Sequence, residues 1–200
     1  MSVSFDQSET KRNLLRAFAG ESQARNRYTF AAGLAKKNGL YVVEAVFRFT
    51  AGQELAHGRV FYDYLEKCSG ENIAVDGTYP VDLYPTVLEH LRAAQHNEYQ
   101  EYEHDYTGFA HTAKEEGFPE ISHVFSQIAR IEQIHGDRFG QFADLLEKGK
   151  LFINEEECQW VCLNCGYVVT ATRPPEMCHV CKHNQGYFVR MEMVPFQMKK

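Results

Sequence analysis

The sequence has no long apolar run, and no block of Lys or Arg concentrates positive charge in one segment. A membrane-spanning helix needs roughly 18 or more successive apolar residues, so the first absence argues against insertion into a bilayer. The formal net charge is −6, which argues against nucleic acid or an anionic membrane as the main partner. The first residues, MSVSFDQSETKRN, contain no apolar stretch of the kind found in secretion signals. We therefore expect a cytoplasmic protein.

Cysteine is scarce over most of the chain and concentrated near its end. Cys68 stands alone, and residues 158–181 contain the other five cysteines. Without a secretion signal, such clustering favours a metal site over disulfides. The pairs Cys162-x-x-Cys165 and Cys178-x-x-Cys181 have the spacing of a four-thiolate site, which binds either zinc or iron. We expect Cys68 and Cys158 to be ordinary thiols.

Residues from about 10 to 148 are predicted to form four long helices. Asn38-Gly39, Pro85, Gly117 and Pro119 divide them into segments 10–37, 40–68, 85–116 and 119–148. The first and third links are short, so each joins antiparallel neighbours. The middle link, residues 70–83, can reach roughly 46 Å when extended, which is about one helix length. Two hairpins joined by a long crossover form the all-α, four-helix ferritin-like bundle that we predict.

The composition changes near residue 154 to cysteines, prolines and short β-like runs at 167–169 and 187–189. We predict a ferritin-like bundle over residues 1–153 and a small β domain over residues 154–200. A unit of about 45 residues buries too little apolar surface to be stable alone, so we expect the thiolate-bound metal to hold it together.

Acidic residues interrupt an apolar stripe on each of the four predicted helices. A single Glu on such a stripe is usually solvated, and a single buried His is usually an ordinary core residue. Two Glu-x-x-His pairs and further Glu residues, all near the middles of the stripes, instead favour one shared site. Glu21 and Glu54 are 33 residues apart and Glu98 and Glu132 are 34 apart, as in a duplicated hairpin. The candidate ligands are Glu21, Glu54, His57, Glu98, Glu101, Glu132 and His135.

Burying these carboxylates without cations would cost several kcal/mol each, so we predict a pair of metal ions among them. Two Glu-x-x-His helices plus a Glu from each of the other two form the ligand set of di-iron and di-manganese bundles. Oxygen-rich ligation with some imidazole suits iron or manganese. Two ferrous ions are neutralised by four carboxylates, whereas two ferric ions favour a fifth. We therefore hypothesise that Glu101 and His57 compete for one iron as its oxidation state changes.

A bundle with these ligands, followed by a CxxCGY…CxxC unit, resembles the rubrerythrin family with its C-terminal rubredoxin-like domain, over roughly residues 10–195. The resemblance implies a non-haem di-iron peroxidase that reduces hydrogen peroxide to water in oxidative stress defence. It implies that electrons come from rubredoxin or an NAD(P)H-dependent reductase through an iron bound by the four cysteines. It also implies a head-to-tail homodimer.

The resemblance assigns roles to individual residues. Glu54 and Glu132 would bridge the irons, Glu21 and Glu101 would bind one of them, and Glu98 and His135 the other. His57 resembles the histidine that replaces the carboxylate of Glu101 on reduction. Tyr28 and Tyr106 resemble tyrosines that hydrogen-bond into the site, although ordinary core aromatic residues would show the same pattern. The sequence departs from the family at Thr107 and His179, where proline is common, and neither change removes a ligand.

Two other classes of function account for parts of the pattern. A ferroxidase or other iron-handling protein would need the bundle but not the thiolate centre. A zinc-ribbon interaction module would do no redox chemistry and would be colourless. A redox-capable carboxylate site in the same chain favours iron over zinc at the four cysteines.

Overall fold

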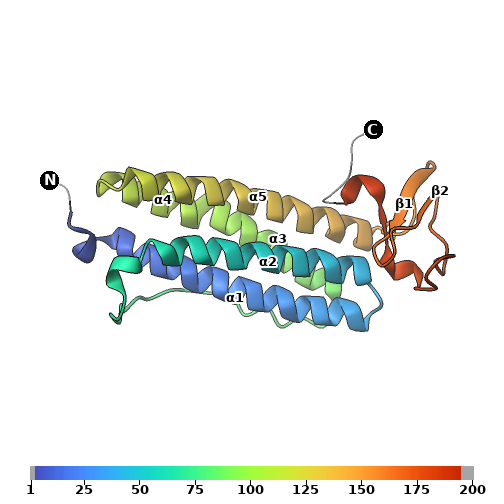
Figure 1. The fold of residues 1–200 in the computed structure, drawn as a ribbon, viewed down its shortest axis with the longest axis horizontal. Coiled ribbons are helices and arrows are strands. Elements are labelled where there is room, and N and C mark those ends of the chain that lie inside the picture. Colours follow the sequence, from blue (N-terminus) through green and yellow to red (C-terminus); the bar gives the residue numbers. More distant parts are fainter. Residues whose placement is uncertain (1–2, 195–200) are drawn as a thin grey trace.

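The computed structural model describes residues 3–194, so residues 1–2 and 195–200 of the two predicted domains lie outside the described part. Four helical segments form a bundle, and a three-stranded sheet sits at one end of it (Figure 1). The segments are α1 (Glu9–Lys37), α2 (Tyr41–Asp63), a third made of α3 (Val87–Gln100), a π-helical turn (Glu101–Asp105) and α4 (Tyr106–Glu115), and α5 (Pro119–Glu147). The predicted ferritin-like bundle with a small β unit is confirmed. Within residues 3–194, no helix is both long and apolar enough to cross a membrane.

Local sequence signals account for most helix ends. The Ser8 side chain caps α1, Thr86 and Glu89 form a capping box at α3, and Pro119 occupies the first turn of α5. Gly39, Gly117 and Gly149 follow three helix ends with φ of 71°, 91° and 63°, a conformation that glycine adopts without strain. The second helix is shorter than predicted, because α2 ends at Asp63 and only a 3-10 turn continues over Glu66–Cys68.

The crossover between α2 and α3 runs along the bundle beside α1 (Figure 1). It has no regular secondary structure and is held by side-chain contacts to α1 at two levels. Arg16 Nη2 donates to Asp76 Oδ1 at 2.6 Å, and Arg27 Nη1 donates to Asp82 Oδ2 at 2.8 Å. Since α1 packs against α2, and α3 and α4 pack against α5, the chain forms the two predicted hairpins joined by a long crossover.

The C-terminal unit is a small antiparallel sheet with strand order β2-β1-β3. The strands are β1 (Cys158–Cys162), β2 (Val168–Ala171) and β3 (Phe188–Arg190), with Trp160 opposite both Val169 and Arg190. The sequence patterns indicated β2 and β3 but not β1. The buried core consists of Trp160, Cys162, Cys178 and Phe188. Such a small core agrees with the expectation that a metal stabilises this unit.

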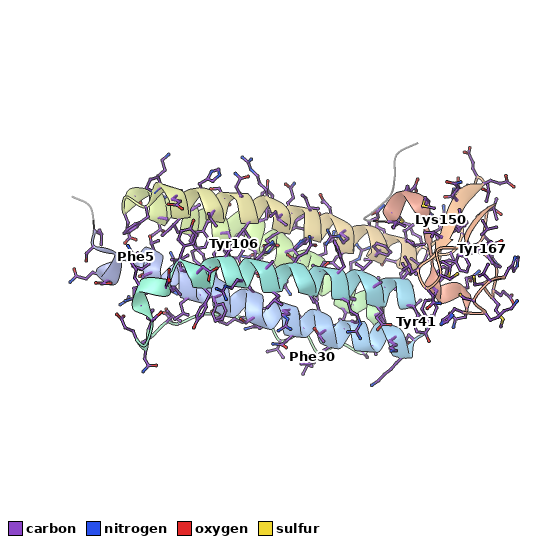
Figure 2. The ribbon with its side chains drawn as sticks, in the orientation of Figure 1. Phe5, Phe30, Tyr41, Tyr106, Lys150 and Tyr167 are labelled. Atoms are coloured by element: carbon purple, nitrogen blue, oxygen red, sulfur yellow. The ribbon has the colours of Figure 1, made fainter. Side chains whose placement is uncertain are left out.

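The sheet unit is seated on the turn between α1 and α2. The rings of Tyr41 and Tyr187 stack with centroids 4.0 Å apart. A Cβ placed on Gly186 would lie 1.9 Å from the carbonyl oxygen of Gly39, so the two backbones touch at a position that admits only glycine. Figure 2 shows Tyr41 at the end of the bundle that faces the sheet unit.

Replacing Gly186 with Ala is expected to lower the free energy of unfolding by about 1–3 kcal/mol, because the new Cβ cannot fit against Gly39. Denaturant unfolding, followed by the fluorescence of Trp160 (the chain's single tryptophan), would measure the change. Gly52→Ala is the matched control. Gly52 lies inside α2 with no neighbour within 4 Å of its Cβ, so this change should stabilise by roughly 0.5–1 kcal/mol. Equal stability of Gly186→Ala and the wild type would contradict this contact.

Candidate metal centres

Six of the seven predicted ligands of the bundle meet in two overlapping groups. One group contains Glu21, Glu54, His57 and Glu132, and the other contains Glu54, Glu98, Glu132 and His135. Within each group, one ligand atom from every residue lies within 4.8 Å of the others. Glu54 and Glu132 belong to both groups, so the two possible ion positions are adjacent. The seventh candidate, Glu101, lies outside both groups.

Each helical segment of the bundle contributes to this cluster. The two members of a Glu-x-x-His pair reach it together, because residues three apart on a helix share a face. The Glu-x-x-His pairs come from α2 and α5, and single Glu residues come from α1 and α3. Aromatic pairs border the cluster along the bundle. Phe47 and Phe139 pack on one side with ring centroids 5.1 Å apart, and Phe61 and Phe125 pack on the other at 4.9 Å. The polar cluster therefore lies between two apolar layers of the bundle.

The carboxylate oxygens and imidazole nitrogens approach one another without forming hydrogen bonds. His135 Nδ1 lies 2.8 Å from Glu132 Oε2 and 3.1 Å from Glu54 Oε1. His57 Nδ1 lies 2.9 Å from Glu132 Oε1 and 3.3 Å from Glu54 Oε2. All four of these oxygens and both nitrogens lack hydrogen-bond partners among the described residues, although the residues are buried. Buried polar atoms are normally paired, so their convergence fits the ligation of cations, and oxygen with imidazole suits iron.

The pKa values of the residues in the cluster also favour the binding of cations there. Burial and repulsion from Glu54 raise the pKa of Glu98 to about 8. Burial and neighbouring carboxylates raise the pKa of Glu21 and of Glu101 well above the ordinary value. Burial lowers the pKa of His57, but its contacts with Glu132 and Glu54 outweigh this and raise it to about 9. Protons therefore neutralise the cluster when no cation does.

Two buried tyrosines orient the outer carboxylates. The Tyr28 hydroxyl donates to Glu98 Oε1, and the Tyr106 hydroxyl donates to Glu21 Oε1 at 2.6 Å. The second oxygen of each carboxylate, Oε2, has no hydrogen-bond partner among the described residues and remains available for an ion. Burial raises the pKa of both tyrosines, so each remains a donor. Figure 2 shows Tyr106 among the side chains between the helices.

Glu101 begins the π-helical turn that separates α3 from α4. The Tyr106 backbone N–H donates to the Glu101 carbonyl, and the Thr107 hydroxyl donates to the Tyr102 carbonyl at 2.7 Å. The prediction of an uninterrupted helix over 85–116 missed this turn. Such turns are frequent at functional sites, since they change the direction of side chains. Glu101 is only half-buried and borders a cavity, unlike the other acidic candidates.

The four predicted cysteine ligands form a third group. The sulfur atoms of Cys162 and Cys181 are 3.7 Å apart, as are those of Cys165 and Cys178. A tetrahedron with metal–sulfur bonds of about 2.3 Å has edges of about 3.8 Å, so the spacing fits a single bound ion. Donation from the His183 backbone N–H lowers the pKa of Cys181 to about 5, which favours the thiolate form. Cys68 and Cys158 lie outside this group.

Aromatic side chains surround the four cysteines. His179 lies inside the second knuckle, between Cys178 and Cys181, with its Nδ1 3.4 Å from the Tyr167 hydroxyl. Trp160 and Phe188 are buried with Cys162 and Cys178, while Tyr167 and Tyr187 pack against the same cluster. The four aromatic residues thus pack around the thiolates.

The chain matches two family models. The model described as Rubrerythrin matches residues 12–143, and that described as Rubrerythrin, rubredoxin-like domain matches residues 160–189. Rubrerythrin of Porphyromonas gingivalis is 43% identical over 192 residues, covering 96% of this chain and 94% of the relative. Rubrerythrin of Nitratidesulfovibrio vulgaris is 40% identical over 181 residues, covering 90% of this chain and 93% of the relative.

Solved structures agree with these matches. The fully reduced, all-ferrous state of nigerythrin has a TM-score of 0.62 and 25% identity, covering 95% of this chain and 88% of that one. Bacterioferritin BfrA of Mycobacterium tuberculosis has a TM-score of 0.61 at 19% identity, covering 74% of this chain and 90% of that one, and shows the fold alone. The chain therefore belongs to the rubrerythrin family, with a carboxylate–histidine di-iron site in its ferritin-like bundle and a four-cysteine iron site in its rubredoxin-like domain.

Proposed function

We propose that this protein is a non-haem peroxidase that reduces hydrogen peroxide to water and so defends the cell against oxidative stress. The observation that carries the proposal is the pair of ligand groups that share Glu54 and Glu132. When bound there, two ferrous ions supply the two electrons that, together with two protons, convert one hydrogen peroxide to two waters. The aromatic layers on two sides of the site hold the helices that carry the ligands in place.

The geometry supports a specific assignment of ligands. Glu54 and Glu132 each direct one oxygen toward His57 and the other toward His135, as bridging carboxylates would. In the proposed arrangement, Glu21 and Glu101 would bind one ion, and Glu98 and His135 would bind the other. His57 lies within the first group and Glu101 outside it, which supports an exchange of these two side chains at one ion.

Tyrosine hydroxyls complete the proposed catalytic set. Tyr28 and Tyr106 hold Glu98 and Glu21 in place, and each carries a proton at the edge of the ligand cluster. Their raised pKa values keep both hydroxyls protonated at neutral pH, so each continues to donate its hydrogen bond to the carboxylate that it orients. Glu101 and His57 complete the set as the exchanging pair.

The four-cysteine iron is the proposed route for electrons from rubredoxin or an NAD(P)H-dependent reductase. Within one chain this site lies at one end of the bundle, whereas Glu54 and Glu132 lie near the middles of α2 and α5 (Figure 1). A head-to-tail homodimer would bring one subunit's cysteine site closer to its partner's carboxylate site. Leu55 on α2 and Ile134 on α5, 53% and 57% exposed, are apolar residues that such an interface could cover. The cytoplasmic location and the domain boundary between residues 153 and 154 stay predictions.

Replacing Glu101 or His57 with Ala is expected to slow peroxide turnover about 10- to 100-fold, because each change removes one partner of the proposed exchange. Hydrogen peroxide consumption driven by NADH and a reductase would measure the effect, with iron content determined in parallel. Glu103→Ala is the matched control, since Glu103 lies in the same π-helical turn but is exposed. Unchanged rates in both variants would contradict the assignment.

A Cys181→Ser variant distinguishes peroxide reduction from iron handling. It should lose the red colour of ferric thiolate and the NADH-linked activity, because electrons no longer reach the bundle. With hydrogen peroxide as the oxidant, ferrous ions at the carboxylate site should still be oxidised once, as in a ferroxidase. NADH-linked turnover that survives the loss of the cysteine iron would contradict the proposed electron route.

A further inference from the structure

A cavity of about 310 Å³ lies between α1, the crossover and the third helical segment. Its wall includes Gly20 of α1, Tyr79 of the crossover, and Asn97, Gln100, Glu101 and Tyr106 of the third segment. Two of these residues belong to the carboxylate centre. Glu101 is a proposed ligand, and Tyr106 donates its hydroxyl proton to Glu21. The cavity therefore extends from the surface to the edge of the metal site.

A larger groove near the bundle does not share this property. A groove of about 720 Å³ between α2, α5 and the C-terminal unit is lined mainly by apolar side chains such as Val46, Phe49 and Phe142. None of the proposed ligands borders that groove. A molecule on its way to Glu101 would therefore pass through the cavity beneath the crossover.

The charged side chains around this cavity indicate what kind of molecule it suits. Arg16 is neutralised by Asp76, and Arg27 is neutralised by Asp82, which also accepts from Asn97 Nδ2 at 2.8 Å. The carboxylates of Glu101 and Asp105 also line the cavity, and neither forms a salt bridge among the described residues. The wall thus offers amide groups and carboxylates, a lining that suits a small, polar, uncharged molecule better than an anion.

Tyr79 is fixed in the wall of the cavity by contacts on two sides. Its hydroxyl donates to the Arg16 carbonyl oxygen at 3.0 Å. Its ring lies against two glycines, since a Cβ on Gly77 would come within 2.8 Å of the ring and one on Gly20 within 3.7 Å. A ring held by a hydrogen bond and packed against glycine cannot easily move aside.

We propose that this cavity is the access route of hydrogen peroxide to the carboxylate centre, and that Tyr79 restricts it to small hydroperoxides. The inference rests on the proposed peroxidase function and adds its specificity-determining residue. Hydrogen peroxide is uncharged and can exchange hydrogen bonds with Asn97, Gln100 and Arg27 along the wall. Bulky organic hydroperoxides would be stopped at the Tyr79 ring.

The selectivity test compares two variants of Tyr79. Tyr79→Ala should raise kcat/KM for cumene hydroperoxide about tenfold, with kcat/KM for hydrogen peroxide changed less than about twofold. Tyr79→Phe keeps the ring and removes only the hydroxyl, so it should retain the selectivity of the wild type. Thr78→Trp, at an exposed position bordering the cavity, should lower kcat/KM for hydrogen peroxide several-fold at unchanged iron content. Unaltered selectivity in Tyr79→Ala, or unaltered hydrogen peroxide kinetics in Thr78→Trp, would overturn the proposal.

A second measurement does not depend on turnover. A water-soluble carbodiimide with a small amine, applied to the full-length protein as isolated and after metal removal, would label accessible carboxyl groups that mass spectrometry then identifies. Glu101 should be labelled faster in Tyr79→Ala than in the wild type by about tenfold, and more slowly in Thr78→Trp. Glu98, 1% exposed, is the internal control and should not change. Equal labelling of Glu101 in all proteins would overturn the access route even if the wild type is an active peroxidase. Absence of peroxidase activity with the expected labelling pattern would instead refute the proposed function.

Discussion

Removing the metal from the bundle is expected to leave a protein whose free energy of unfolding falls as the pH rises from about 6 to about 9. In the metal-free cluster, protons take the place of the cations. The folded state holds protons on Glu98, whose pKa is raised to about 8, and on His57, whose pKa is raised to about 9. Glu21 and Glu101 act in the same direction because burial and repulsion raise their pKa values.

The sign follows from comparing each folded pKa with its unfolded value. A group whose pKa is raised by folding contributes stability that is complete below the unfolded pKa and is lost as the pH passes through the folded pKa. For Glu98 this loss runs from about 4.5 to about 8, and for His57 from about 6.5 to about 9. Each extra proton held by the folded state changes stability by about 1.4 kcal/mol per pH unit. Glu54 has the opposite sign, since its pKa is lowered to about 2, and its contribution is lost only in acid.

Urea unfolding of the metal-free and iron-loaded proteins between pH 6 and pH 9, followed by helical circular dichroism, would measure the dependence. The free energy of unfolding that the loaded protein gains over the metal-free protein should increase with pH. The reason is that metal ligands bind as deprotonated groups. Glu98→Gln is the matched control, since its amide oxygen can still accept from Tyr28 but does not titrate in this range. The free energy of unfolding of the metal-free Glu98→Gln protein should fall less steeply with pH than that of the metal-free wild type. A metal-free protein whose stability is constant or rises over this interval would contradict the prediction.

Much of the fold could be predicted because its signals are local. Pro119, the glycines after three helices and the length of the crossover were sufficient to place four helices and two hairpins. The second helix was overestimated because residues 64–68 carry helix-compatible side chains, while the chain there turns toward the crossover. Strand β1 was missed because it is short and includes Cys162, so the metal motif obscured the strand pattern.

The metal ligands could be predicted because each alters a stripe of otherwise apolar residues. Six of the seven were brought together by the fold, but their proximity depends on the packing of four helices, which periodicity alone does not describe. The π-helical turn was missed although its signal is present. The buried positions Leu91, Ala94 and Glu98 are followed by Tyr106 and Ala110, one residue later than an unbroken helix would place them. A stripe that shifts by one residue in this way indicates an inserted residue.

The contribution of the crossover to the site could not have been predicted from local pattern. Tyr79 and Asp82 lie in a segment without periodicity, and nothing in the sequence links them to Arg16 or Arg27 on α1. Their position depends on the path of an extended chain along the bundle, which the length of the link permits but does not specify. Residues in such connections become interpretable only when the contacts of the folded chain are known.

Replacing Glu132 with Ala is expected to prevent the bundle from holding either ion of the pair. Glu132 lies in both ligand groups, is fully buried on α5, and approaches His135 at 2.8 Å and His57 at 2.9 Å. Removing it takes one oxygen from each ion position and leaves two imidazoles without their nearest carboxylate. Loss of even a supporting partner of a metal ligand weakens binding about 10- to 100-fold, so loss of a shared ligand should exceed this. Peroxide turnover should fall with the iron of the bundle.

The two kinds of iron site allow this prediction to be checked within one protein. The Glu132→Ala protein should keep the red colour of its cysteine iron, because Cys162 and its partners lie in the C-terminal unit, while total iron falls to that of the cysteine site. Glu101→Ala is the informative comparison, since Glu101 is outside both groups and that variant should retain iron in the bundle although its peroxide turnover is slower. A Glu132→Ala protein that binds iron in the bundle as the wild type does would show that the shared carboxylate is dispensable. A Glu101→Ala protein that loses as much iron would show that Glu101 contributes as much to metal binding as Glu132 does. The distinction between the enclosed ligands and Glu101 on the cavity wall would then be wrong.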